Sequence, residues 1–159
     1  MNFLEQIISE WYTYRGYFVR TNIKFGKLSH GGWKGEIDVV AYEPKMKEFI
    51  HIETSTDADA WDKRKERFCR KFQNAAEFYS KLFPFPINKI RKIALVGFFK
   101  PKIKPDFGDS IDVILVPEYI REITDELKKK NPMQDAIPEN YPLLRAIQFS
   151  AFYNNASEK

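Results

Sequence analysis

The chain has 159 residues, of which 43% are hydrophobic and 16% aromatic, enough apolar material to bury the core of a single domain. Aromatic residues in such number exclude disordered, collagen-like and coiled-coil proteins. The 26 Lys and Arg residues against 22 Asp and Glu give a net charge of +4, which is compatible with nucleic acid or an acidic surface as partner but requires neither.

Composition also argues against zinc sites and membrane segments. One cysteine, Cys69, and two histidines, His30 and His51, cannot assemble a zinc site of the Cys/His type, and a lone cysteine forms no internal disulfide. The longest apolar run, residues 93–99, is far shorter than the roughly 20 residues of a membrane-spanning helix. Glu5 lies within the first predicted helix, which argues against a secretory signal. We therefore expect a cytoplasmic protein without a membrane partner.

The first half of the chain predicts one helix followed by three strands. Apolar residues recur at helical spacing over 3–15, and Gly16 is placed to end this helix. Residues 17–25 are rich in aromatic and β-branched types, residues 34–42 alternate with a period of two, and residues 49–55 follow after a short turn. Each of the three segments is therefore predicted to be a strand.

The second half predicts a long helix, two strands and two further helices. The apolar period changes to 3.6 over 58–83. Buried strands are expected over 91–99 and 111–116, and helices over about 117–130 and 141–155. The order α-β-β-β-α-β-β-α-α predicts an α/β (α+β) fold, a single domain in which helices flank a mixed central sheet.

Carboxylates on the second and third predicted strands are the most informative feature. The polar face carries Glu36, Asp38 and Glu53, and the short turn at 43–46 makes the two strands antiparallel, so Asp38 and Glu53 can lie close together. Adjacent like charges destabilise a sheet unless a cation neutralises them. Oxygen ligands alone favour Mg²⁺ or Mn²⁺, ions that commonly assist chemistry on phosphates. Alternatively, these acids face solvent or pair with Lys34 and the basic helix.

This pattern resembles the PD-(D/E)XK nuclease superfamily, whose restriction-endonuclease-like core has the order α-β-β-β-α-β. The matching segments, within about residues 3–99, are Glu5 in the first helix, Gly35-Glu36-Ile37-Asp38-Val39-Val40-Ala41, Ile52-Glu53-Thr54-Ser55, and residues 73–79 in the long helix. The resemblance implies that core over about 3–116, with extra C-terminal helices. It also implies a metal-dependent DNA endonuclease that hydrolyses phosphodiester bonds. Asp38, Glu53 and the main-chain carbonyl of Thr54 would then hold Mg²⁺, with Glu5 in support.

The chain departs from the family pattern at one catalytic position, because Ser55 stands where the family has lysine. The resemblance implies that this lysine orients or activates the attacking water and neutralises charge in the transition state, a task for which serine has no charge. Two lysines are candidates to replace it: Lys34, on the strand face of the acids, and Lys65, within the apolar stripe of the long helix. His51 is either a proton carrier or a structural hydrogen-bonding residue.

Basic residues on the long helix are the candidate nucleic-acid contacts. They are Lys63, Arg67, Arg70 and Lys71, with Gln73 at the edge of the apolar stripe. Such residues bind phosphates in a salt-sensitive, sequence-tolerant way, although charge on a helix often only keeps it solvated. Trp33, beside two glycines, is open to two interpretations, a stacking contact with an unpaired base or a core position.

Three functions remain open at this point. The first is a Mg²⁺- or Mn²⁺-dependent endonuclease acting on DNA. The second is a catalytically inactive relative that binds nucleic acid or a partner protein, and the third is an unrelated globular domain with a solvated acidic face. The C-terminal helices either cover the sheet or form a homodimer interface, since symmetric duplex cleavage needs two copies.

Overall fold

A computed structural model of the chain describes residues 2–97, 105–108 and 110–156. Its elements, in chain order, are α1 (Phe3–Tyr14), β1 (Phe18–Lys27), β2 (Trp33–Glu43), β3 (Glu48–Ser55), α2 (Trp61–Ala76), α3 (Tyr79–Leu82), β4 (Lys89–Val96), β5 (Ile111–Leu115), α4 (Val116–Leu127) and α5 (Pro142–Ala156). The strands form one sheet in the order β1-β2-β3-β4-β5. Antiparallel pairing joins β1, β2 and β3, and parallel pairing joins β3, β4 and β5. The predicted α/β class and mixed sheet are therefore confirmed.

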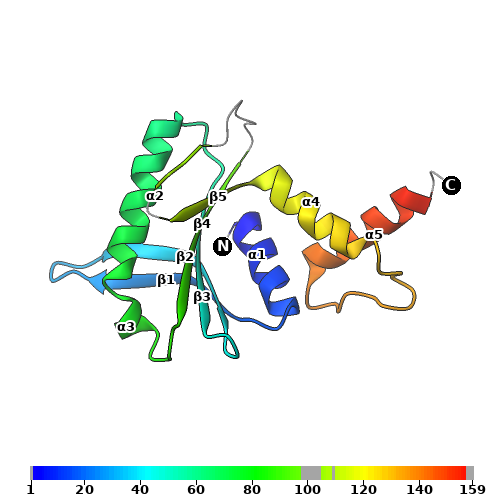
Figure 1. Ribbon diagram of the computed structural model, residues 1–159, viewed down its shortest axis with the longest axis horizontal. Coiled ribbons are helices and arrows are strands. Elements are labelled where there is room, and N and C mark those ends of the chain that lie inside the picture. Colours follow the sequence, from blue (N-terminus) through cyan, green and yellow to red (C-terminus); the bar gives the residue numbers. More distant parts are fainter. Residues whose placement is uncertain (1, 98–104, 109, 157–159) are drawn as a thin grey trace.

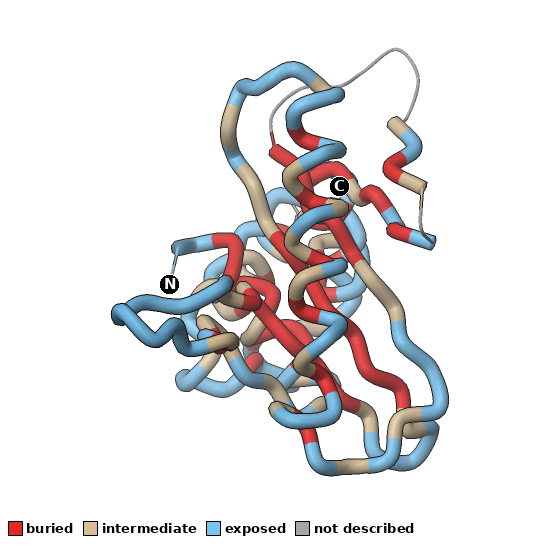
Figure 2. Tube along the Cα trace, turned by 90° about the vertical axis from the view of Figure 1, so that its left-hand side faces the viewer, coloured by how far each residue is buried: buried red, intermediate tan, exposed pale blue. Residues whose placement is uncertain are grey.

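Helices cover both faces of this sheet (Figure 1). Helices α2 and α3 lie on one face, and α1, α4 and α5 lie on the other. The buried segments run along the strands through the middle of the molecule, while exposed segments follow the outer helices and turns (Figure 2). No described helix is long and apolar enough to cross a membrane.

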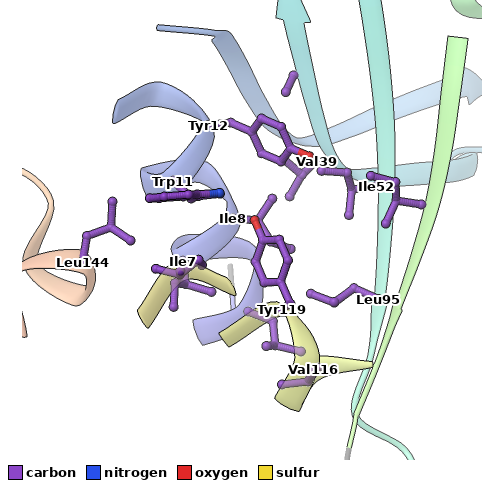
Figure 3. Packing of buried hydrophobic residues seen from close by; sticks show 14 of the residues in the cluster. Ile7, Ile8, Trp11, Tyr12, Val39, Ile52, Leu95, Val116, Tyr119 and Leu144 are labelled. Atoms are coloured by element: carbon purple, nitrogen blue, oxygen red, sulfur yellow. The ribbon is translucent and has the colours of Figure 1, made fainter. Parts of the chain in front are cut away.

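The helix α1 anchors the core on its side of the sheet. Its N-terminus is capped by Asn2, whose side chain accepts hydrogen bonds from the backbone N–H groups of Leu4 (2.9 Å) and Glu5 (3.0 Å). Ile8 of α1 faces the strands, and Trp11 lies between α1 and α5 (Figure 3). Full burial of a large apolar side chain stabilises the fold by about 1.5–3 kcal/mol. This packing fixes α1 against the sheet.

The long helix predicted over 58–83 is the main correction to the element order. It divides into α2 and the short α3, with a turn in which the N–H of Phe78 donates to the carbonyl of Ala75 (2.9 Å). The break allows Phe78 to contact Phe25 of β1 and Tyr79 to reach the sheet, where it contacts Phe49. The other predicted elements match in type, with ends shifted by a few residues. The expected end of the fourth strand, at residues 98–99, lies outside the described residues.

Side chains of β1 and β2 change faces at one point of the hairpin. Ile37 packs in the core under α2 and α3, whereas Val39 packs in the core under α1, although strict alternation would place both on one face. The change falls at Asp38, and Asn22 lies opposite it between the register pairs Thr21↔Val39 and Ile23↔Ile37. Asn22 adopts a positive φ of 52°, which asparagine tolerates better than most residues. The alternation predicted for residues 34–42 is therefore wrong at Asp38.

Candidate functional site

Asp38 and Glu53 share the ammonium group of Lys71. Asp38 lies on β2, Glu53 lies on the adjacent antiparallel strand β3, and Lys71 reaches both from α2. Lys71 Nζ is 3.0 Å from Asp38 Oδ1 and also forms an ion pair with Glu53 Oε2. We call these three residues the acid–lysine cluster. The strand pairing and the short turn therefore bring the two acids together, as the sequence predicts.

Asp38 is held by the end of β3. The register between β2 and β3 ends at the pair Val39↔Ile52, so the two strands separate beyond it. Asp38 Oδ2 accepts hydrogen bonds there from Thr54 N (2.8 Å) and Thr54 Oγ1 (3.1 Å). These bonds orient the carboxylate and leave Oδ1 to face Lys71. Thr54 thus fixes Asp38 through its N–H and hydroxyl groups, and the role of its carbonyl as a metal ligand stays a prediction.

Glu53 is fully buried, and its two oxygens have different surroundings. Oε1 is 2.6 Å from His51 Nε2, whereas Oε2 pairs with the Lys71 ammonium by charge but meets no donor at hydrogen-bonding geometry. Burial raises the pKa of Glu53 to about 8, and the charge of Asp38 adds to this effect, while Lys71 opposes it. Glu53 is therefore a carboxyl group that titrates close to neutral pH.

His51 and Tyr79 form a buried chain behind Glu53. The Tyr79 hydroxyl is 2.6 Å from His51 Nδ1, and the imidazole is fully buried. Burial lowers the pKa of His51 to about 3, and the charge of Lys71 adds to this effect, so the ring is neutral. Burial also raises the pKa of Tyr79, which keeps its hydroxyl protonated. The consistent assignment has Tyr79 donating to Nδ1, and Nε2–H donating to Glu53.

This arrangement favours one of the two interpretations of His51. A neutral, fully buried imidazole between two fixed partners orients Glu53 and has no access to solvent protons. This geometry favours the interpretation of His51 as a structural hydrogen-bonding residue, and its role as a proton carrier stays a prediction. Sequence reasoning did not identify Tyr79, because its position depends on the break between α2 and α3.

Lys71 occupies a different place from the one the sequence suggests. The sequence predicts that Lys71 is a nucleic-acid contact on the helix, but its ammonium group lies against the acids of the sheet. Burial alone would lower the pKa of Lys71, yet the neighbouring carboxylates of Glu53 and Asp38 outweigh burial and hold it above its ordinary value. Lys71 therefore stays charged. The sequence signal for this position is that Lys71 directly precedes Phe72, which belongs to the buried stripe of α2.

The two lysines expected to replace the family lysine lie elsewhere. Lys34 forms an ion pair with Glu77 at the start of the turn between α2 and α3. Lys65 is exposed, so its expected place in the apolar stripe is wrong; the buried position belongs to its neighbour Arg64. The stripe is set by Phe68 and Phe72, and Arg64 is one helical turn before Phe68.

Glu5 is connected to the candidate site through the side chain of Asn22. Asn22 Nδ2 donates to Glu5 Oε2 (3.0 Å), and the same group lies 3.3 Å from Glu36 Oε1. Because Asn22 lies opposite Asp38, Glu5 fixes the strand beside Asp38 through this amide. Its buried carboxylate also completes the cap of α1 by accepting from the backbone N–H of Asn2 (3.2 Å).

A second polar group, which we call the Asp57 cluster, follows the end of β3. It consists of Ser55, Asp57, Asp59, Arg64 and Arg67. Ser55 donates to Asp57, and Arg67 Nη2 donates to Ser55 Oγ (3.2 Å) while pairing with both aspartates. Burial alone would raise the pKa of Asp57, but the Ser55 hydroxyl and the two arginines outweigh burial and hold this pKa below its ordinary range. Arg67 thus brings positive charge beside Ser55.

The remaining predicted contacts lie on the outer side of α2. Lys63, Arg70 and Gln73 are exposed there, and Arg67 and Lys71 are each about one-third exposed at the edge facing the acids. The exposed surface of α2 is therefore continuous with the acid–lysine cluster.

The donor set for a metal ion consists of two carboxylates. Within the described part of the chain, no group of three or more His, Cys, Asp and Glu side chains could hold a metal. Mg²⁺ is usually bound by one or two carboxylates and retains several waters or substrate oxygens. Asp38 Oδ1 and Glu53 Oε2 are two such carboxylate oxygens, and both contact the ammonium of Lys71.

Comparison with known proteins adds nothing to this description, since no protein-family model, no curated protein and no solved structure gives a significant match to the chain.

Proposed function

We propose that this chain is a Mg²⁺- or Mn²⁺-dependent endonuclease that hydrolyses phosphodiester bonds in DNA. The observation that carries the proposal is the acid–lysine cluster, in which carboxylates from adjacent strands share one ammonium group. Phosphodiester hydrolysis needs oxygen ligands for a hard cation and a fixed positive charge near the transferring phosphoryl group. Asp38 and Glu53 would supply the first, and Lys71 the second.

The arrangement of elements supports this proposal. The order α1-β1-β2-β3-α2-α3-β4 is that of the PD-(D/E)XK core which the sequence resembles, apart from the short α3, and the two acids lie on β2 and β3. Ser55 has no charge for the lysine role, and Lys71 would supply that charge from α2. Arg67, which contacts Ser55, would add a second positive charge beside it.

Each side chain has a distinct role in this proposal. A bound Mg²⁺ or Mn²⁺ would lower the pKa of a water molecule and neutralise charge on the phosphate. Thr54 orients Asp38, and the neutral His51 orients Glu53. Lys71 keeps its proton, so it holds the attacking water or the phosphate by charge and does not act as a base. The exposed cations of α2 would bind neighbouring phosphates.

A second function, nucleic-acid binding without cleavage, is favoured by one observation. The ammonium of Lys71 contacts both acids, and because the pKa of Glu53 is raised to about 8, the one positive charge balances the one carboxylate that is ionised at neutral pH without a metal ion. In this case the cluster stabilises the fold, and the basic surface of α2 carries the function. The two proposals differ in whether an added divalent ion enters the cluster.

Nicking of supercoiled plasmid in Mn²⁺ separates these functions. For the enzyme, we expect wild-type nicking that falls at least about 100-fold in Asp38→Asn and Lys71→Met, the scale for loss of one transition-state charge contact. Lys65→Met is the matched control, because it removes an exposed lysine from the same helix. Gel retardation without nicking, together with no heat of Mn²⁺ binding, would instead support the binding protein.

A further inference from the structure

The β1–β2 hairpin ends in an exposed apolar tip. Its last register pair is Lys27↔Trp33, and the turn is closed by hydrogen bonds from Leu28 N to Gly32 O (3.1 Å) and from Gly31 N to Leu28 O (3.2 Å). Trp33 is 47% exposed and Leu28 is 38% exposed. We call residues 27–34 the hairpin tip. In Figure 1 this hairpin reaches beyond α2 at the left of the molecule.

The exposure of Trp33 has no structural explanation within the fold. Trp11, by contrast, is 1% exposed in the core, and Trp61 contacts the Arg64 guanidinium and Phe107. Trp33 has no aromatic or cation–π partner among the described residues. Its indole is therefore available to a ligand, and it directly follows a turn in which Gly31 and Gly32 adopt positive φ angles of 93° and 85°.

Charge at the hairpin tip identifies the kind of ligand. The segment from residue 23 to residue 35 contains Lys24, Lys27, Lys34 and His30 but no Asp or Glu. Lys34 is paired with Glu77, whereas Lys27 is exposed directly opposite Trp33. An exposed indole beside a lysine suits a single-stranded nucleic acid, because the base stacks on the ring and the phosphate pairs with the ammonium.

The distance to the acid–lysine cluster also suits a nucleic acid. Trp33 precedes Asp38 by five residues on the same strand, a span of at most about 17 Å for extended backbone. At the roughly 3.4 Å per phosphate of stacked duplex DNA this span is about five nucleotides, and it is fewer where the strand is unpaired and extended. One strand could therefore contact both sites.

We propose that Trp33 stacks on an unpaired base of the substrate and that Lys27 binds a phosphate beside it. The preferred ligand is then DNA with a single-stranded segment, such as a splayed end or flap, over a continuous duplex. As a statement about an enzyme's substrate, this inference rests on the proposed function. The binding itself needs no metal ion and can be measured separately.

The test is fluorescence anisotropy of the full chain in EDTA with labelled 15-nucleotide oligo(dT), a splayed-end duplex and a blunt duplex. Trp33→Ala is expected to weaken binding to the first two by about 5- to 150-fold, the usual contribution of one stacked base, and to leave blunt-duplex affinity unchanged. Trp33→Phe should restore most of the affinity. Phe18→Ala is the matched control, because Phe18 is 69% exposed at the other end of β1.

Several results would overturn the inference. They are an unchanged affinity in Trp33→Ala, an equal loss for blunt duplex and single strand, or an equal effect of Phe18→Ala. Trp33-dependent binding to phosphatidylserine vesicles without oligonucleotide binding would assign the tip to a membrane surface instead. Plasmid nicking without a Trp33 effect refutes only this inference, whereas Trp33-dependent binding without nicking refutes only the cleavage proposal.

Discussion

The hydroxyl of Tyr79 provides a direct test of the buried chain behind Glu53. Tyr79→Phe removes the donor to His51 Nδ1 (2.6 Å) and leaves a buried imidazole nitrogen without a partner. Leaving a buried polar group unsatisfied costs about 1–3 kcal/mol. For a domain of this size, each kcal/mol lowers the melting temperature by about 2–4 °C. We therefore expect Tyr79→Phe to melt roughly 2–12 °C below the wild type.

Tyr119 provides the matched control on the other side of the sheet. Its hydroxyl is buried and has no hydrogen-bond partner among the described residues, so its burial is uncompensated. Tyr119→Phe removes that uncompensated group, and we expect its free energy of unfolding to be unchanged or higher by about 1–3 kcal/mol. Both variants lose a buried tyrosine hydroxyl, but only that of Tyr79 has a hydrogen-bond partner among the described residues. The two substitutions should therefore shift stability in opposite directions or by clearly different amounts.

Urea denaturation of both variants at pH 7, followed by circular dichroism, measures the difference. Plasmid nicking then tests positioning, because loss of a group that orients a metal ligand typically costs about 10- to 100-fold in metal affinity or activity. Tyr42→Phe, which loses a hydroxyl bonded to the carbonyl of Pro86, should lose stability but retain nicking. Equal stability changes in Tyr79→Phe and Tyr119→Phe would refute the reasoning.

Three further predictions follow from the geometry. The pKa of Glu53 is raised from 4.5 to about 8, so the folded chain binds this proton more tightly than the unfolded chain. Protonation of Glu53 therefore stabilises the fold fully below about pH 4.5, and this stabilisation is lost as the pH rises through about 8. Glu53→Gln should abolish that pH-dependent loss in urea titrations across this range. Lys71→Met should retain or strengthen Mn²⁺ binding by calorimetry while abolishing nicking, because the ammonium competes with the ion for the acids. Gly35→Ala should lower stability by about 1–3 kcal/mol in urea denaturation, because its Cβ would lie 2.5 Å from Phe25 Cζ.

The elements were predictable because their signals are local. Periodicity identified α1 and the strands, and a short turn between β2 and β3 dictates antiparallel pairing. That pairing brings Asp38 and Glu53 together whatever the remainder of the chain does. The convergence of the two acids could therefore be predicted from the sequence.

The cation of the site was not predictable in the same way. Which residue of α2 faces the acids depends on how the helix is rotated over the sheet, and this rotation is set by Phe68, Phe72 and the turn before α3. The buried stripe contains Arg64, one residue before the predicted Lys65, which is exposed. Helical spacing then places Lys71 seven residues after Arg64, on the same side of α2.

The change of faces at Asp38 is also a tertiary effect. Its only sequence signal is an asparagine at the opposing position, a residue that tolerates positive φ but does not require it. The alternation rule therefore aligned Lys34 with Asp38, although the structure pairs Lys34 with Glu77. Local patterns fix which residues lie on a strand, and the bend of the hairpin decides which of them share a site.

The position of Lys71 on a helix has a consequence for how the proposed enzyme would respond to a metal ion. A lysine on the strand of Glu53 would be fixed by the sheet, whereas Lys71 reaches the acids through a flexible side chain that is 32% exposed. Asp38 Oδ2 is already bonded to Thr54, so an entering cation must take the oxygens that face the ammonium. The side chain of Lys71 would then move toward solvent, where the scissile phosphate lies in the proposed complex. In the proposed enzyme, the ion pair without metal and the catalytic arrangement with metal would thus be two states of one cluster, in which the ammonium would contact the acids in the first and the phosphate in the second.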